Sequence, residues 1–218
     1  MSDFLPTLTD NWGLFGEAFA NTILLFVLAA LFALIIGTVL GAFRVSPVPA
    51  LRWFGTGYVT FLRNTPLTLV FFFVAFGFPY LEINFSFTTF AVIALSAYTA
   101  AFVCEAVRSG INTVPAGQAE AARAVGLTFA QTLRFVILPQ AFRAVVPPLA
   151  SILIALLKNT TIAAGFSVAE AGSIRANLSE LGYPALGGLI WVVIGFLILV
   201  LPLSAAQRNL ERRWSVAR

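Results

Sequence analysis

The chain has 218 residues, of which 60% are hydrophobic and 10% charged, and its formal net charge is +4. A soluble domain carries about 25% charged residues, so this composition indicates a membrane protein and excludes an ordinary soluble fold. Histidine is absent and Cys104 is the only cysteine, which excludes an internal disulfide and a zinc site built from histidine and cysteine.

Residues 1–17 precede the first long apolar stretch and carry acidic charges instead of basic ones. A secretory signal peptide begins with basic residues, whereas the charges here are Asp3, Asp10 and Glu17. Apolar residues at loose helical spacing predict a short helix that lies at a membrane interface, with a frayed terminus as the alternative. The predicted transmembrane domain then covers residues 18–218.

Five hydrophobic stretches are each long enough to cross a bilayer as a helix. They are Ala18–Phe43, Phe54–Phe78, Phe87–Val107, about Pro148–Phe166 and Gly187–Ala206. No long polar domain separates them, so the sequence predicts one all-α membrane domain with five transmembrane helices. The sequence does not divide into the two matching halves that are typical of inverted-repeat secondary transporters. A unit this small indicates that a second copy or a paralogue completes the transport path.

Basic residues gather in alternate connections, and this asymmetry predicts the orientation of the chain. One side holds the connection after the first span, the segment after the third span and the tail, with Arg44, Arg52, Arg108, Arg123, Arg134, Arg143, Arg208, Arg212, Arg213 and Arg218. The other side holds a single basic residue, Arg175, and the acids Asp3, Asp10, Glu17, Glu82, Glu170 and Glu180. We therefore predict an external N-terminus and a cytoplasmic C-terminus. Membrane lipids account for the net charge, so no nucleic-acid partner is expected.

The cytoplasmic segment, about residues 108–147, combines small residues, regular charges and turn signals. A helix is predicted to start near Gln118, and Gly126 is placed to end it. A second, amphipathic helix is predicted from about Phe129 to Leu138, with Pro139 as its end. Alanines in the first helix allow close approach of another protein, which favours a docking helix. An ordinary solvated loop helix is the alternative.

Several motifs resemble those of ABC importer permeases. Glu120-Ala121-Ala122, then Gly126 and Val136-Ile137-Leu138-Pro139, are similar to the EAA loop of that family, which usually has Ile at the position of Val136. Arg63-Asn64-Thr65-Pro66-Leu67 and Lys158-Asn159-Thr160-Thr161 look like the branch that transports polar amino acids. Many members have Gly in place of Asn64 and Asp in place of Asn159. The variants here are similar to those of glutamate permeases from high-GC Gram-positive bacteria.

The resemblance implies a type I ABC importer fold in the bacterial cytoplasmic membrane. In that family the short helix inserts into a groove of the ATP-binding subunit, which implies the coupling residues Ala119, Glu120, Ala121, Ala122, Arg123 and Gly126. The implied partners are the ATP-binding subunit, a second permease subunit (the same chain or a paralogue) and an extracellular solute-binding protein. The chain has no GxxxxGK[ST] motif, so we expect ATP and Mg²⁺ on the partner ATPase. This chain is predicted to bind no cofactor or metal and to be no enzyme itself.

Two cationic residues lie well inside predicted spans. Arg63 and Lys158 each fall about ten residues into a span, which places them roughly 15 Å from its cytoplasmic end. A cation at that depth usually faces a bundle interior or an aqueous cavity. Pro66 is expected to leave the carbonyl of Leu62 as a free acceptor at the same depth. No acid is expected there, because Glu105 is predicted to lie near the cytoplasmic end of its span.

A positive cavity with hydrogen-bonding groups suits an anionic or zwitterionic solute, and two cations match the two carboxylates of glutamate. The predicted solute path consists of Arg63, Asn64, Thr65, Lys158, Asn159, Thr160 and Thr161. The alternative is that both cations snorkel to the interface or bind carbonyls of broken helices. Glutamate, glutamine, aspartate, arginine and histidine all stay open as solutes.

The sequence thus predicts the permease subunit of an ATP-driven importer for a polar amino acid, with glutamate as the first candidate. A stand-alone secondary transporter or channel for small anionic or zwitterionic solutes is the alternative. That alternative predicts proton- or sodium-coupling acids, which are missing from the middle of the predicted spans. An intramembrane enzyme would need histidine, metal ligands or paired carboxylates in the bilayer, and these are missing as well.

Overall fold

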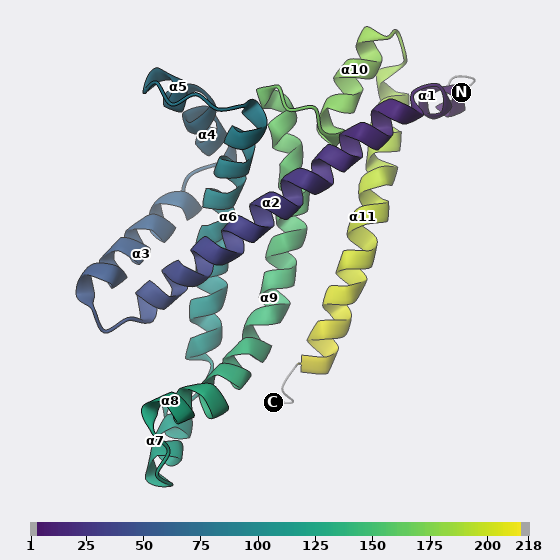
Figure 1. Ribbon diagram of the computed structural model, residues 1–218. Coiled ribbons are helices and arrows are strands. Elements are labelled where there is room, and N and C mark those ends of the chain that lie inside the picture. The colour runs from purple at the N-terminus through teal and green to yellow at the C-terminus, as the bar shows by residue number, and fades with distance from the viewer. Residues whose placement is uncertain (1–3, 215–218) are drawn as a thin grey trace.

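The computed structural model describes residues 4–214, which form helices and turns with no strand among them. Asp3 and Arg218, which enter the orientation argument, lie outside that range. Within it, four helices are long and apolar enough to cross a membrane, or up to five if one bent pair counts as a single span. Three long helices stand side by side and the longest crosses them diagonally (Figure 1). The prediction of an all-helical chain with several apolar spans is confirmed.

The elements alternate between long helices and short connecting pieces. In chain order they are α1 (Phe4–Thr9), α2 (Trp12–Val45), α3 (Pro49–Arg63), α4 (Leu67–Phe72), the π-helix η1 (Phe73–Gly77), α5 (Phe78–Tyr80), α6 (Phe87–Asn112), α7 (Ala116–Ala124), α8 (Phe129–Gln131), the π-helix η2 (Thr132–Ile137), α9 (Leu138–Asn159), the 3₁₀ helices η3 (Thr160–Phe166) and η4 (Ala171–Ser173), α10 (Ile174–Glu180) and α11 (Ala185–Trp214). Helices α2, α6 and α11 contain or closely match three of the predicted spans.

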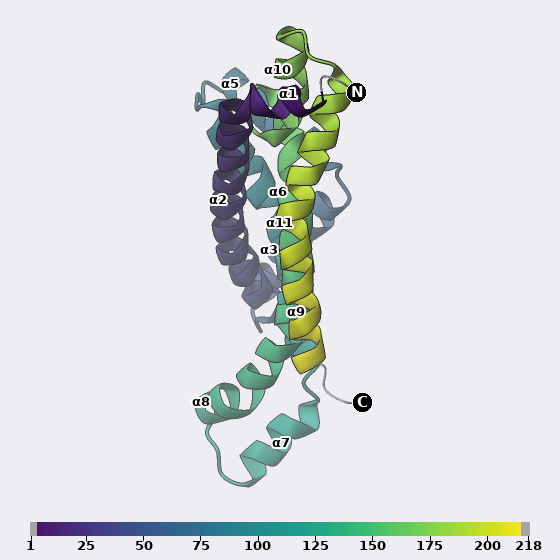
Figure 2. The same ribbon diagram turned by 90° about the vertical axis from the view of Figure 1, so that its right-hand side faces the viewer.

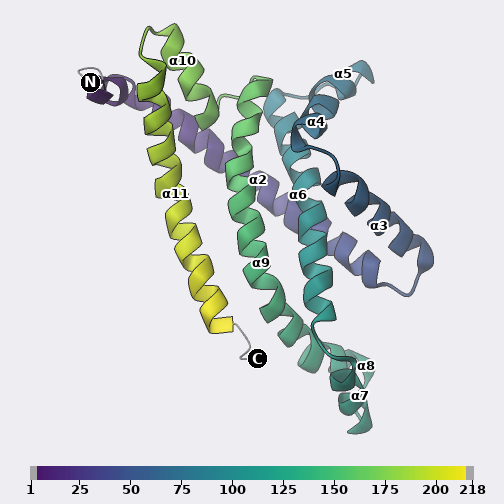
Figure 3. The ribbon, with the colours of Figure 1, turned by 180° about the vertical axis from the view of Figure 1, so that it is seen from behind.

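Helix α6 is the centre of the bundle and packs on α2, α3, α4 and α9 (Figure 3). In the most apolar stretch of α6, 61% of the residues are buried, against 11% in that of α11, so α11 lies at the outer edge of the bundle. Small residues allow this close packing, since a Cβ atom on Gly37 of α2 would lie 2.7 Å from the carbonyl oxygen of Ala100. Ala100 and Ala101 are fully buried, so this part of α6 presents small side chains to the helices packed against it.

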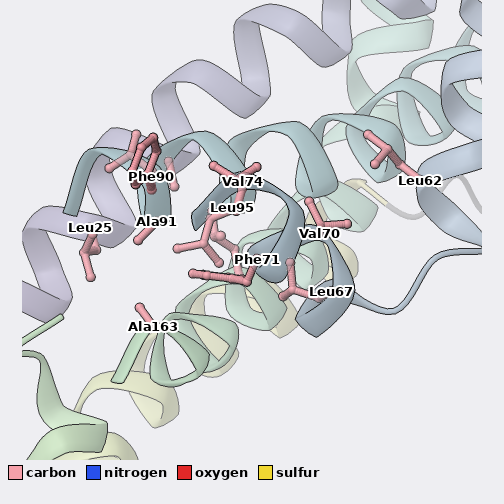
Figure 4. Packing of buried hydrophobic residues seen from close by; sticks show 14 of the residues in the cluster. Leu25, Leu62, Leu67, Val70, Phe71, Val74, Phe90, Ala91, Leu95 and Ala163 are labelled. Carbon is pink, nitrogen blue, oxygen red and sulfur yellow. The ribbon is translucent and has the colours of Figure 1, made fainter. Parts of the chain in front are cut away.

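The largest apolar cluster joins α4 and η1 to α2, α6 and η3. Phe71 lies at its middle and is almost fully buried, with Leu95 of α6 near it (Figure 4). Its ring stacks on Phe166 of η3 with the two centroids 5.0 Å apart. The cluster therefore fixes the segment after the break of the second span against the end of the fourth span.

The prediction of Phe54–Phe78 as one continuous helix is wrong, whereas its crossing of the membrane as a single span stays a prediction. Helix α3 ends at Arg63, α4 begins at Leu67, and the two segments meet at an angle of 105°. Pro66 explains the break, because it has no amide donor and it forces the residue before it out of the helical region. Helices α3 and α4 to α5 therefore form a bent pair, which has the geometry of a broken span or of a re-entrant loop.

The prediction that Pro139 ends a separate helix is also wrong, because α8, η2 and α9 follow one another without interruption. In the π-helical turn the amide of Leu138 donates to the carbonyl of Leu133, five residues back. The wider turn accommodates the missing amide of Pro139, so the helix continues. The helix that contains the predicted fourth span begins well before Pro148, since Phe129–Phe166 is one continuous candidate span.

The N-terminal segment contains α1 and the first turns of α2. The indole of Trp191 in α11 donates to the carbonyl of Phe4 at 2.8 Å, and the two rings stack with their centroids 4.7 Å apart. Helix α2 begins at Trp12 and runs across the predicted boundary between residues 17 and 18 without a break. The interfacial position of α1 stays a prediction.

Candidate functional site

Helices α7 and α8 form a hairpin that projects beyond the ends of the long helices (Figure 2). The amide of Leu127 donates to the carbonyl of Ala122 at 3.1 Å, and the amide of Gly126 donates to that of Arg123 at 3.0 Å. These two bonds form a Schellman cap, and Gly126 takes the left-handed conformation that this cap needs, with φ 89°. The prediction that Gly126 ends the helix is confirmed.

Helix α8 starts at a capping box that the sequence analysis missed. The amide of Thr128 donates to Oε1 of Gln131 at 2.9 Å, and the amide of Gln131 donates to Oγ1 of Thr128 at 3.3 Å. The signal was present in the sequence, because Thr followed three residues later by Gln is the usual pattern of such a box. The two caps fix both ends of the turn between α7 and α8.

The predicted coupling residues divide into an inner and an outer set. Ala122 is buried and Ala119 is half-buried, and α7 packs on η2, so this side of the helix faces its own chain. Glu120, Ala121 and Arg123 are exposed. Neither Glu120 nor Arg123 forms an ion pair within the described residues. Their charges are therefore available to another molecule.

Two large apolar side chains extend this exposed surface. Val125 is 80% exposed and Phe129 is 77% exposed, and both flank the turn between α7 and α8. Neither residue was predicted to be functional, although apolar residues inside a charged loop were the available signal. Exposed apolar groups rimmed by charge are typical of a protein–protein contact.

The break in the second span provides its own hydrogen bonds. The side-chain amide of Asn64 donates to the carbonyl of Thr60 at 2.7 Å, and the hydroxyl of Thr65 donates to the carbonyl of Phe61 at 2.8 Å. A broken helix leaves such carbonyls without amide partners, which is costly inside a membrane. In this conformation the side chains of Asn64 and Thr65, two predicted solute-path residues, stabilise the end of α3.

The carbonyl of Leu62 was expected to be a free acceptor because of Pro66. Instead it accepts the amide of Thr65 at 3.4 Å, which closes a tight turn at the end of α3. The expectation is therefore wrong. The physical reason is that the last turn tightens from an i to i+4 pattern into an i to i+3 pattern, which finds a donor before the proline.

Arg63 lies beside an acid, although the sequence predicted that no acid would lie at its depth. Its Nη1 atom is 3.6 Å from Oε1 of Glu105 in α6, and its guanidinium lies 5.7 Å from the ring centroid of Phe102. Helix α3 packs along α6, so the last residue of α3 reaches the carboxylate. The same carboxylate also pairs with Arg44 of α2 and with Arg108 of α6, the latter at 3.1 Å.

The second predicted group lies where α9 passes into η3. Lys158 is exposed, and Asn159 is half-buried. Thr160 is fully buried and its hydroxyl donates to the carbonyl of Leu157 at 2.8 Å. The hydroxyl of Thr161 donates to the carbonyl of Lys158 at 2.8 Å. In this conformation Lys158 and Asn159 present polar groups outward, whereas the hydroxyl of Thr160 faces its own helix.

The two groups of predicted solute-path residues border different cavities, and both cavities are lined in part by residues of α6. Arg63 and Asn64 line a cavity of about 250 Å³ together with Glu105. Asn159 lines another of about 260 Å³, and Phe102 lies in its wall. Because the guanidinium of Arg63 lies over the ring of Phe102, this ring is close to both cavities. The structure does not bring Arg63 and Lys158 into contact.

A buried acid at the opposite end of the molecule was not foreseen. Glu170 is fully buried, and its Oε1 accepts the amide of Gly172 at 2.8 Å. The hydroxyl of Thr22 in α2 faces Oε2 of Glu170 at 3.3 Å and the carbonyl of Ala18 at 3.0 Å. Burial raises the pKa of Glu170, and these hydrogen bonds oppose that shift. The carboxyl therefore fastens the connection before α10 to α2.

Known proteins share both the sequence and the fold of this chain. Residues 33–216 match the family described as binding-protein-dependent transport system inner membrane component. The glutamate transport system permease protein GluC of Corynebacterium efficiens is 43% identical over 216 residues, which cover 91% of this chain and 93% of that protein. The probable glutamine ABC transporter permease protein GlnM of Bacillus subtilis is 34% identical, with 94% of this chain and 95% of that protein covered.

Solved structures agree with this assignment. A chain from the crystal structure of an amino acid ABC transporter with histidines superposes with a TM-score of 0.91 at 27% identity, covering 97% of this chain and 98% of that one. A chain of the inward-facing MetNI methionine ABC transporter superposes with a TM-score of 0.75 at 22% identity, covering 96% and 99%, which supports the fold alone. The chain therefore belongs to the family of inner membrane components of binding-protein-dependent transport systems.

Proposed function

We propose that this chain is the permease subunit of an ATP-driven importer for a polar amino acid, and that its solute is L-glutamate. The observation that carries the proposal is the α7–α8 hairpin, which is capped at both ends of its turn and presents exposed charged and apolar groups beyond the bundle. Solute class rests on the resemblance to glutamate and glutamine permeases.

The proposed coupling surface consists of the motif residues Glu120 and Arg123 with the adjacent Val125 and Phe129. A separate ATPase subunit binds ATP and Mg²⁺ and contacts this surface. The helical run from α8 through η2 into α9 leads directly from the hairpin into the bundle. Movement of the hairpin is thereby transmitted to the span that carries Lys158.

The proposed topology counts the broken pair α3 to α5 as one span, which gives five spans in total. The α7–α8 hairpin and the C-terminus then lie in the cytoplasm, and α1 and α10 lie outside. A second permease subunit completes the path, and an extracellular solute-binding protein delivers the solute. The bacterial cytoplasmic membrane is the corresponding location.

The proposed solute path runs along α6 between the two cavities that flank Phe102. Arg63 and Asn159 border these cavities, and Lys158 adds a positive charge near the second. The charge of Arg63 is partly neutralised by Glu105. Lys158 is therefore the residue whose positive charge is available to a solute carboxylate. Thr160 faces its own helix, and its contribution to the path requires a different conformation.

The test is reconstitution of the complete transporter in liposomes with its ATPase and its binding protein. We expect L-glutamate to stimulate ATP hydrolysis and to accumulate in an ATP-dependent manner, whereas liposomes without the ATPase show no uptake. Replacement of both Glu120 and Arg123 by alanine is expected to abolish uptake while the permease still folds. Uptake that persists without the ATPase would show a secondary transporter or channel instead.

Solute contact is tested separately with Lys158→Met in the same complex. We expect a raised KM for L-glutamate and a shift toward glutamine in a competition panel, because one positive partner for the side-chain carboxylate is lost. Arg175→Met, which removes an exposed charge from α10, serves as the matched control. Unchanged transport and unchanged solute preference in Lys158→Met would remove this residue from the path.

A further inference from the structure

A basic cavity lies between the ends of α2 and α6 and the start of α3. It has a volume of about 360 Å³ and is lined by Arg44, Arg52, Trp53, Thr56 and Arg108. The turn between α2 and α3 lies at the same end of the bundle as the α7–α8 hairpin (Figure 1). None of these five residues belongs to the predicted solute path or to the coupling surface.

Positive charge around this cavity is only partly balanced. Among the described residues Glu105 is the one carboxylate that pairs with these guanidiniums, and it is shared by Arg44, Arg63 and Arg108. No acid within residues 4–214 forms an ion pair with Arg52, whose Nη1 donates to the carbonyls of Ser46 and Pro47 at 3.0 and 3.1 Å. Of the three guanidiniums that line the cavity, Arg44 and Arg108 share Glu105 with Arg63 and Arg52 pairs with no described acid, so positive charge is in excess there and favours the binding of a further anion.

Donors for such an anion are present and not all of them are used. The side chain of Arg44 is only 13% exposed, so its charge is poorly screened by solvent. The Nε atom of Arg108 is buried and has no hydrogen-bond partner among the described residues. Each guanidinium presents five N–H groups in a planar fork that matches the oxygens of a phosphate group.

The surroundings of the cavity match a phosphate at a membrane surface. Trp53 is 78% exposed beside Arg52, and exposed tryptophan next to arginine is typical of the level of lipid headgroups. Basic pockets between membrane helices on the cytoplasmic side commonly bind acidic headgroups. We propose that Arg44, Arg52 and Arg108 form a binding site for a phosphate anion, supplied by an acidic phospholipid headgroup or by inorganic phosphate.

The experiment uses the purified, delipidated permease–ATPase complex in a neutral detergent. Its thermal midpoint is followed during titration with phosphatidylglycerol, with phosphatidylcholine, and with inorganic phosphate against chloride of equal ionic strength. We expect phosphatidylglycerol to raise the midpoint and phosphatidylcholine and chloride to leave it unchanged. A rise with inorganic phosphate as well shows that the phosphate group suffices, whereas a rise with phosphatidylglycerol alone assigns the site to the lipid.

Two variants locate the effect without disturbing the pairs of Glu105. Arg52→Gln removes the one lining guanidinium that does not contact this acid, and Thr56→Val removes an exposed hydroxyl from the wall. We expect Arg52→Gln to weaken the apparent affinity about tenfold, as for one lost charge-assisted contact, and Thr56→Val to weaken it less. Both should keep the midpoint of the ligand-free complex.

Arg143→Gln is the matched control, because it removes an exposed arginine of α9 that does not line the cavity. It should respond to phosphatidylglycerol like the unaltered complex. An equal loss of response in Arg143→Gln and Arg52→Gln would show attraction to diffuse charge and overturn the site. The absence of any difference between phosphatidylglycerol and phosphatidylcholine, and between phosphate and chloride, in the unaltered complex would overturn it too.

Discussion

Arg63 at the end of α3 lies 3.6 Å from the carboxylate of Glu105, on the central helix α6. The same carboxylate binds Arg44 of α2 and Arg108 of α6, so one acid holds three helices together at this level. A partly buried carboxylate with several charged donors is a strong local tie, and its removal leaves cations without a counter-charge.

Glu105→Gln is therefore expected to destabilise the complex more than Arg63→Gln. The first change leaves three guanidiniums without their carboxylate, whereas the second leaves Arg44 and Arg108 paired with it. Thermal unfolding in lipid nanodiscs measures the difference, and a change of 1 kcal/mol corresponds to about 2–4 °C for a chain of this size. Equal shifts for the two variants would contradict the sharing of Glu105.

The end of α7 provides a second prediction. Gly126→Ala places a Cβ on a residue with φ 89°, which costs about 1–2 kcal/mol and frays the cap. We expect faster hydrogen exchange in α7 and weaker solute-stimulated ATP hydrolysis. Gly117→Ala is the control in the same helix, since no atom lies within 4 Å of a Cβ there. Equal coupling in both variants would show that the cap has no part in transmission.

Close packing of α2 on α6 provides a third prediction. A Cβ on Gly37 would lie 2.5 Å from the Cβ of Val103, so Gly37→Ala is expected to cost about 1–3 kcal/mol of stability. Gly13→Ala lies in the same helix with no atom within 4 Å, and it should be neutral or stabilising because alanine favours helix. The thermal midpoint of Gly37→Ala in detergent should therefore fall below that of Gly13→Ala.

Glu170 predicts a dependence of stability on pH. Because burial raises its pKa, the folded chain holds this proton more tightly than the unfolded chain. Stability is then highest below the ordinary glutamate pKa of about 4.3 and is lost as the pH rises toward and through the raised pKa. Glu170→Gln keeps the side-chain shape and an acceptor for Gly172 without this titration. We expect it to be more stable than the unaltered chain at high pH.

The pH profile distinguishes this explanation from a general packing effect. The advantage of Glu170→Gln should shrink as the pH falls below the raised pKa, since the native carboxyl is then neutral too. Glu180→Gln, an exposed acid at the end of α10, is the control and should show no such trend. A constant offset between Glu170→Gln and the unaltered chain at all pH values would contradict the assignment.

The features that the sequence predicted correctly are those decided locally. Long apolar runs specify α2, α6 and α11, and a glycine after a run of helix formers specifies the end of α7 at Gly126. Each follows from the periodicity or conformation of nearby residues. Proline was less informative, because Pro66 breaks its helix whereas Pro139 is accommodated by a π-helical turn.

The features that were missed depend on contacts between distant residues. Arg63 meets Glu105 because α3 packs along α6, and Glu170 is buried because its connection folds back onto Thr22 of α2. Neither relationship follows from spacing along the chain. The proposed solute path has the same character, since it depends on which faces of α3, α6 and α9 lie together.

The hydrogen bonds at the break of the second span have a mechanical consequence. Asn64 and Thr65 satisfy carbonyls of their own helix, so these bonds move with α3 as one rigid piece. A swivel of α3 about the break would therefore separate two polar contacts with α6, which are the pair of Arg63 with Glu105 and the bond from Tyr58 to the carbonyl of Ala97 at 2.8 Å. It would also separate the buried apolar contacts of Val59 and Leu62, whereas the hydrogen bonds of the break itself would stay intact.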